Sequence, residues 1–77
     1  MRGTLRRLAA MQMYNFDFID RTKARPIETR NQMLPSLRAA RTRCESLFEN
    51  YGKTIGATSV RLRENGGTKV LYEWPEV

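Results

Sequence analysis

The chain has 77 residues, carries 14 lysines and arginines against 8 acidic residues, and has a net charge of +6, so it can form one domain at most. A single cysteine excludes an internal disulfide and favours a reducing cytoplasm, and no apolar run approaches the roughly 20 residues that span a bilayer. The absence of histidine removes the imidazole base of most acid–base and nucleophilic sites, which argues against an enzyme.

The positive charge is concentrated in the first part of the chain. Residues 1–44 contain ten basic and three acidic groups, a balance of +7, whereas residues 45–77 contain four basic and five acidic groups, a balance of −1. Such a distribution favours an anionic partner, either nucleic acid, an acidic protein surface or a nucleoprotein complex. The alternative is a solvated basic surface without a binding role.

The first 12 residues are basic and are expected to form a tail, so the folded domain is expected to span residues 13–77. The first strong structural signal is the segment 13–19, in which aromatic and polar residues alternate. This period of two predicts a half-buried strand whose aromatic side faces the core. The core side of this strand contains Tyr14, Phe16 and Phe18.

Residues 20–35 show no clean period and include prolines at positions 26 and 35. We predict a long basic loop here, with a short helical turn after Pro26 as an alternative. A loop of about 15 residues is uncommon in a compact domain and is often functional. The cations of this segment are Arg21, Lys23, Arg25 and Arg30.

A helix is predicted next, with Ser36 as its N-cap or, alternatively, with Pro35 in its first turn. Gly52 is expected to end it, because glycine takes the left-handed conformation beyond the last turn of a helix. The apolar stripe, spaced for one helical face, consists of Leu37, Ala40, Cys44, Leu47, Phe48 and Tyr51.

The last third of the chain predicts a hairpin around Asn65-Gly66-Gly67, a sequence typical of tight turns. A three-residue loop places Leu62 opposite Val70, Val60 opposite Tyr72, and Thr58 opposite Trp74. A two-residue loop would instead place Leu62 against Lys69, so the three-residue register is preferred.

The predicted fold class is α+β, with one amphipathic helix on a small antiparallel sheet in the order strand, helix, strand, strand. The helix is expected to cover the face that carries Tyr14, Phe16, Phe18, Val60, Leu62, Val70, Tyr72 and Trp74. The other face is expected to stay open and to carry Asn15, Asp17, Ser59, Arg61, Arg63, Lys69, Leu71 and Glu73. Exposed sheet edges recruit strands from other chains, so a homodimer through one edge is a natural outcome.

The candidate partner-binding residues are cations of the loop and the helix. They lie in one half of the sequence, which favours their lying close together in space. Cys44 belongs to the apolar stripe and is interpreted as inert packing, and one such ligand is too few for a zinc site, so we predict no catalytic residue, metal or cofactor. The predicted basic surface consists of Arg21, Lys23, Arg25, Arg30, Arg38, Arg41 and Arg43.

Short segments across residues 13–74 resemble a family of small uncharacterised bacterial domains built from a strand, a helix and a closing hairpin. The matching residues are Tyr14-x-Phe16-Asp17, then Leu34-Pro35-x-Leu37-x-Ala39-Ala40-Arg41, then Val60 to the Asn65-Gly66-Gly67 turn and Val70-Leu71. The overall format is also similar to small phage anti-CRISPR proteins, a fold-level analogy that implies a non-catalytic inhibitor. Three hypotheses follow: an inhibitor docked on a nucleic-acid-processing complex, a nucleic-acid-binding module, or a structural subunit of a larger assembly.

Overall fold

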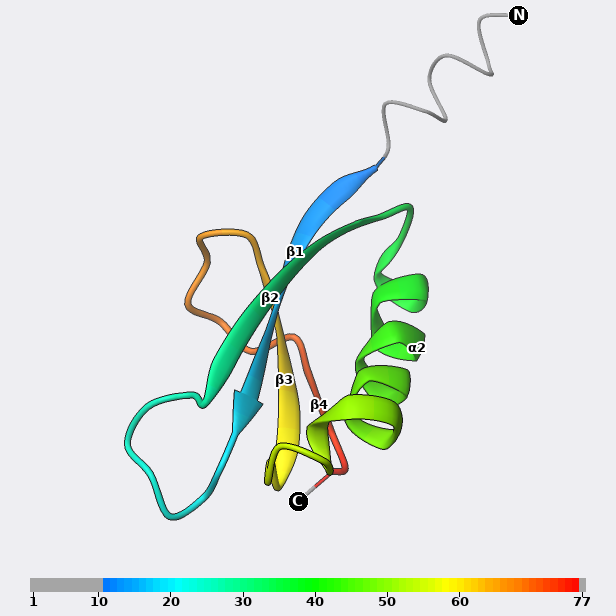
Figure 1. The fold of residues 1–77 in the computed structure, drawn as a ribbon. Helices are drawn as coiled ribbons and strands as arrows, with labels where there is room; N and C mark the ends of the chain where they lie inside the picture. Colours follow the sequence, from blue (N-terminus) through cyan, green and yellow to red (C-terminus); the bar gives the residue numbers. More distant parts are fainter. Residues whose placement is uncertain (1–10, 77) are drawn as a thin grey trace, which may run out of the picture.

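The computed structural model describes residues 11–76, so most of the predicted tail, together with residue 77, lies outside the described residues. The described part has the predicted α+β fold, with a helix packed on one face of a four-stranded antiparallel sheet of order β2-β1-β3-β4 (Figure 1). In chain order the elements are β1 (Gln12–Ile19), β2 (Glu28–Leu34), α2 (Leu37–Leu47), a π-helical turn η1 (Phe48–Gly52), β3 (Ser59–Glu64) and β4 (Tyr72–Trp74).

Strand β1 lies inside the sheet and supplies the centre of the core. Its pairing with β3 places Phe16 opposite Leu62 and Phe18 opposite Val60. These four side chains have no solvent exposure, and Tyr14 is only 3% exposed. The predicted strand and its core-facing aromatic side are therefore confirmed.

The long basic loop predicted for residues 20–35 is wrong in its second half, because residues 28–34 form β2. This strand pairs antiparallel with β1, and Asn31 lies opposite Asn15. Most of its side chains are exposed or half-buried because it is an edge strand that α2 barely reaches. An edge strand with little burial on either face leaves no hydrophobic period to detect. The sheet therefore has two strands before the helix, and not the single one predicted.

Helix α2 begins as predicted after Ser36, whose Oγ accepts a hydrogen bond from the Ala39 amide at 3.1 Å. Ala40 and Cys44 of the predicted stripe are buried, whereas Leu37 is 39% exposed and lies outside the core. The predicted left-handed cap at Gly52 is wrong, since the positive φ of 89° belongs to Gly56. Gly52 instead permits close packing, because a Cβ there would lie 3.3 Å from the Phe48 ring, closer than most Cβ contacts.

The hairpin exists, but its predicted register is wrong by two residues. Leu62 lies opposite Tyr72, and Val60 lies opposite Trp74. The connection therefore contains a tight turn, in which the Gly67 amide donates to the Glu64 carbonyl at 2.8 Å, followed by an irregular segment. A two-residue shift preserves the sheet face of each side chain. Val70 and Leu71 lie before β4 in the irregular segment, where strand alternation does not apply. Val70, predicted in the core, is therefore 43% exposed, and Leu71, predicted on the open face, packs against the core.

Candidate functional site

Cys44 is buried under the sheet, and its Sγ donates to the Val60 carbonyl at 3.3 Å. Burial raises the pKa of its thiol to about 12, so the thiolate needed for nucleophilic or metal chemistry does not form at neutral pH. These observations make Cys44 a packing residue.

In residues 11–76, no helix combines the length and apolarity required to cross a bilayer.

Four cations of the described residues are neutralised by carboxylates of the same chain. Arg63 pairs with Asp17 at 2.6 Å, and Arg61 pairs with Glu73 at 3.2 Å, both on the sheet face away from α2. Lys53 pairs with Glu49 at 2.8 Å along the chain. The fourth, Arg30, pairs with Glu28 at 2.6 Å.

Within residues 11–76, Arg30 is therefore the one predicted binding cation that forms an ion pair. Its guanidinium also lies over the Tyr51 ring, 3.9 Å from the ring centroid. The Tyr51 hydroxyl in turn donates to Glu28 at 2.6 Å. Hydrogen bonds from Tyr51 and Arg30 hold the pKa of Glu28 below its ordinary value. Arg30 thus joins β2 to η1, which is a structural contact.

The sheet face away from α2 is less open than predicted, because a network of polar side chains covers it. Asp17 accepts hydrogen bonds from Arg63 Nε at 2.6 Å, from Arg63 Nη2 at 3.0 Å and from Thr29 Oγ1 at 2.7 Å. Burial by itself would raise the pKa of Asp17, but the hydrogen bonds from Arg63 and Thr29 and the nearby guanidinium charges lower it overall. The carboxylate is therefore charged and fully engaged at neutral pH, and it holds Arg63 across β1 and β3.

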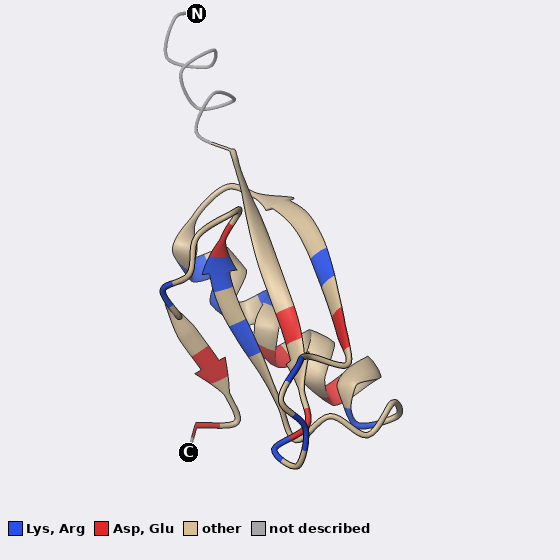
Figure 2. Cartoon of the chain, turned by 90° about the vertical axis from the view of Figure 1, so that its left-hand side faces the viewer, with Lys and Arg blue, Asp and Glu red and all other residues tan. Residues whose placement is uncertain are grey.

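The cations of the 20–27 loop line a pocket of about 330 Å³ on this same face. Figure 2 shows the face with α2 behind it and with basic segments of the loop below those of β3. Within residues 11–76, no carboxylate lies within ion-pair distance of the loop cations. The cations that line the pocket are Arg21, Lys23, Arg25, Arg61 and Arg63.

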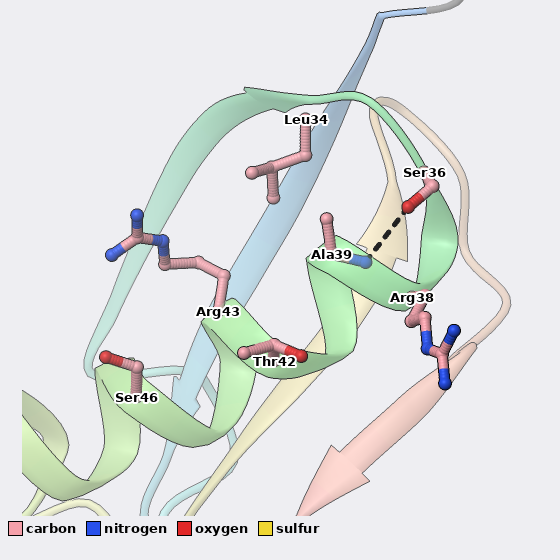
Figure 3. A pocket seen from close by; sticks show the side chains of 7 residues that line it. All are labelled: Leu34, Ser36, Arg38, Ala39, Thr42, Arg43 and Ser46. Atoms are coloured by element: carbon pink, nitrogen blue, oxygen red, sulfur yellow. Dashed lines mark hydrogen bonds between the residues drawn. The ribbon is translucent and has the colours of Figure 1, made fainter.

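The helix cations lie on the other side of the molecule. Arg38 and Arg43 line a cleft of about 560 Å³ together with Leu34 at the end of β2. Figure 3 shows Arg43 extending from α2 beside β2, while Arg38 points to the opposite side of the helix. Arg41 lies 5.4 Å from the centroid of the Tyr72 ring. In the described part of the chain, these three arginines form no ion pair.

The structure therefore does not gather the predicted basic surface into one patch. Because the helix packs on one sheet face and the loop borders the other, the loop cations line one pocket and Arg38 and Arg43 line another, with no residue in common. Arg41 lines neither pocket. We name the two sets of cations the loop cations (Arg21, Lys23 and Arg25) and the helix cations (Arg38, Arg41 and Arg43).

Sequence reasoning did not include Arg61 and Arg63 among the candidate binding residues, although both line the pocket beside the loop cations. The alternation of β3 had placed them on the face away from the helix, which was the available signal. The alternation could not predict the path of the loop, which brings the loop cations next to Arg61 and Arg63.

No protein family, curated protein or solved structure matches this chain.

Proposed function

We propose that the protein is a non-enzymatic binding protein that docks its loop and helix cations on anionic surfaces of a nucleic-acid-processing protein complex. In this proposal it acts as a small inhibitor of the kind that phages and mobile elements encode. The single cysteine supports placing this action in the cytoplasm.

One observation carries the proposal. Six of the seven predicted binding cations have no carboxylate within ion-pair distance in residues 11–76, whereas the arginines of β2 and β3 are paired. These six cations therefore have no ion-pair partner within the described residues and are free to contact a partner molecule. Unpaired arginines present hydrogen-bond donors to the acceptor oxygens of a partner.

Because its cations lie on two separate faces, the protein can contact two anionic surfaces at once and insert between them as a wedge. A single flat contact would use the cations of one face alone. Such a wedge would occupy a groove between an acidic protein face and bound nucleic acid, and it would block the groove without any chemistry. The buried, protonated Cys44 is consistent with a role that needs no nucleophile.

The test is capture by the tagged protein from lysate of the cells that naturally make it, with and without nuclease treatment. We expect a stoichiometric protein partner that survives nuclease treatment. The loop variant Arg21→Ser/Lys23→Ser/Arg25→Ser and the helix variant Arg38→Ser/Arg41→Ser/Arg43→Ser should each lower its affinity by at least about tenfold, or about 1.4 kcal/mol. The partner complex, purified without the protein, should also bind its nucleic acid more weakly once the protein is added.

The matched control is Lys53→Ser, which removes an exposed cation that is already paired with Glu49. It should change the affinity by less than about twofold, because exposed pairs contribute little. Unchanged capture by both triple variants would contradict the proposal, and so would the absence of any retained protein.

A second candidate function is direct nucleic-acid binding, favoured by the gathering of five cations around one pocket. In that case capture would disappear after nuclease treatment, and affinity for random DNA or RNA would fall steeply with salt.

A further inference from the structure

The pocket beside the loop cations is formed by three parts of the chain that are distant in sequence. The loop after β1 forms one wall, the irregular segment before β4 forms the other, and β1 and β3 form the floor. Its volume is about 330 Å³, at the lower end of the range for small-molecule sites. It is lined by Asp17, Ile19, Arg21, Lys23, Ala24, Arg25, Pro26, Arg61, Arg63, Thr68 and Val70.

The charge of this pocket is strongly positive even after its internal pairs are subtracted. It contains five cations and one carboxylate. Asp17 neutralises Arg63, and Glu73, which is not part of the lining, neutralises Arg61. Asp20 of the same loop, whose charge interacts with Lys23, is a third carboxylate beside the pocket. Five cations less three carboxylates leaves a local charge of +2. The remaining cations are those of the loop, which are exposed and therefore accessible to an anion.

The floor and both walls are held in place by hydrogen bonds. Arg63 Nη1 donates to the Gly67 carbonyl at 2.5 Å, and the Gly66 amide donates to Asn15 Oδ1 at 3.1 Å, so the turn after β3 is fixed to the sheet. On the other side, the Arg21 amide donates to Thr58 Oγ1 at 3.2 Å.

Asp20 shapes the loop itself by accepting the Thr22 amide at 3.0 Å. The loop backbone is therefore set before any ligand arrives. A pocket with fixed walls avoids part of the ordering cost of binding.

The chemistry of the lining selects the ligand. Guanidinium groups make paired hydrogen bonds to phosphate oxygens, and a local charge of +2 favours an anion with several negative charges. None of the side chains that line the pocket is aromatic, so the described residues offer no ring on which a base could stack.

We propose that this pocket binds the phosphate groups of a compact polyanion and recognises phosphate without reading a base. The phosphates can belong to a free nucleotide or pyrophosphate or to a nucleic-acid backbone, since both present the same oxygens. This site extends the proposed function, because it uses the loop cations with Arg61 and Arg63 and leaves the helix cations aside.

The test is calorimetric titration of the full chain, in about 50 mM salt, with sodium pyrophosphate and with metal-free ATP. We expect one site for each, with affinities within about threefold of each other, because only phosphate is recognised. The loop variant Arg21→Ser/Lys23→Ser/Arg25→Ser should lower both affinities by at least about tenfold. Circular dichroism checks that the variant remains folded.

The matched control is the helix variant Arg38→Ser/Arg41→Ser/Arg43→Ser, which removes the same three charges from the other side of the molecule. It should keep the pyrophosphate affinity within about twofold. Equal losses in the two variants would indicate general attraction to net charge and would overturn the proposal. No binding by the wild-type chain, or a strong preference for ATP over pyrophosphate, would overturn it too.

A thymidine oligonucleotide distinguishes the two sources of phosphate. Competition between oligonucleotide and pyrophosphate for the one site assigns the pocket to a nucleic-acid backbone, while binding of the small anions alone assigns it to free phosphates. Loss of partner capture in the helix variant bears on the proposed function alone, so the two proposals can fail separately.

Discussion

At the scale of single residues, the contact with the widest consequences joins Asp17 to Arg63. The Asp17 side chain is 9% exposed and the Arg63 side chain is 23% exposed, so the pair lies largely out of water. A carboxylate in this position is stabilised only while its hydrogen-bond donors remain in place. The pair therefore fixes β1 to β3 and, through Gly67, fixes one wall of the pocket beside the loop cations.

We predict that Asp17→Asn lowers the free energy of unfolding at pH 7 by about 1–3 kcal/mol, because it removes a charged acceptor from a largely buried guanidinium. The folded-state pKa of Asp17 is lowered, so its contribution is complete above the unfolded pKa of about 3.9 and is lost as the pH falls through the folded value. Denaturant unfolding should show a constant difference between wild type and variant from about pH 5 to 7 that shrinks below about pH 4.

The control for this prediction is Glu64→Gln, which changes an exposed carboxylate that forms no ion pair within residues 11–76. It should have a small effect at every pH. A wild-type–variant difference for Asp17→Asn that grows on acidification would show that the sign of the pKa change is wrong.

At the scale of elements, β2 is the feature that changes the architecture most. It turns a three-stranded sheet into a four-stranded one and moves the edge of the sheet away from β1. The expected homodimer through a sheet edge stays a prediction. The structure offers β2, seven residues long, as the longer of the two edges, compared with three residues in β4.

We predict that the double variant Met13→Cys/Met33→Cys forms a disulfide on mild oxidation, because these residues are direct partners across β1 and β2. Closing a loop of about 20 residues should stabilise the fold by up to about 3 kcal/mol. Cys44, with its buried thiol and raised pKa, should not take part. Mass spectrometry of the oxidised protein and its thermal midpoint check both effects.

The matched variant is Met13→Cys/Gln32→Cys, which shifts the second cysteine by one residue. Gln32 pairs with Tyr14 and lies on the other face of the sheet from Met13. This variant should remain reduced under the same conditions. Equal oxidation of both variants would mean that residues 28–34 do not hold this register.

At the scale of the whole molecule, one small core supports the fold. The core combines aromatic side chains of β1 with Val60 and Leu62 of β3, under Ala40 and Cys44 of α2. A domain of this size buries only about 60% of its unfolded surface, so each core side chain accounts for a large share of the stability. Surface positions such as Val70 should matter far less.

We predict that Leu62→Ala lowers the free energy of unfolding by about 2–5 kcal/mol, because Leu62 is completely buried. Val70→Ala should change it by less than about 0.5 kcal/mol, because Val70 is 43% exposed. Urea unfolding of both variants measures the difference. Similar losses of unfolding free energy at the two positions would contradict the observed register, in which Leu62 lies opposite Tyr72. They would support the register predicted from the sequence, in which Leu62 lies opposite Val70.

The sequence by itself determined the α+β class, the buried aromatic side of β1, and the cap and most of the buried stripe of α2. Each of these is a local pattern: alternation marks a half-buried strand, helical spacing marks a buried stripe, and Ser36 satisfies amides in the next turn. Composition likewise determined the positive charge and the absence of histidine.

Only the tertiary structure decided that residues 28–34 form a strand, that the hairpin register shifts by two residues, and that the cations divide between two faces. Periodicity records burial, and β2 is buried too little on either face to show a period. A shift of two residues preserves the side of the sheet on which each residue lies, so alternation cannot detect it. The position of a cation on a loop depends on the path of the backbone, which for Arg21 is set by a hydrogen bond to Thr58, distant in the sequence.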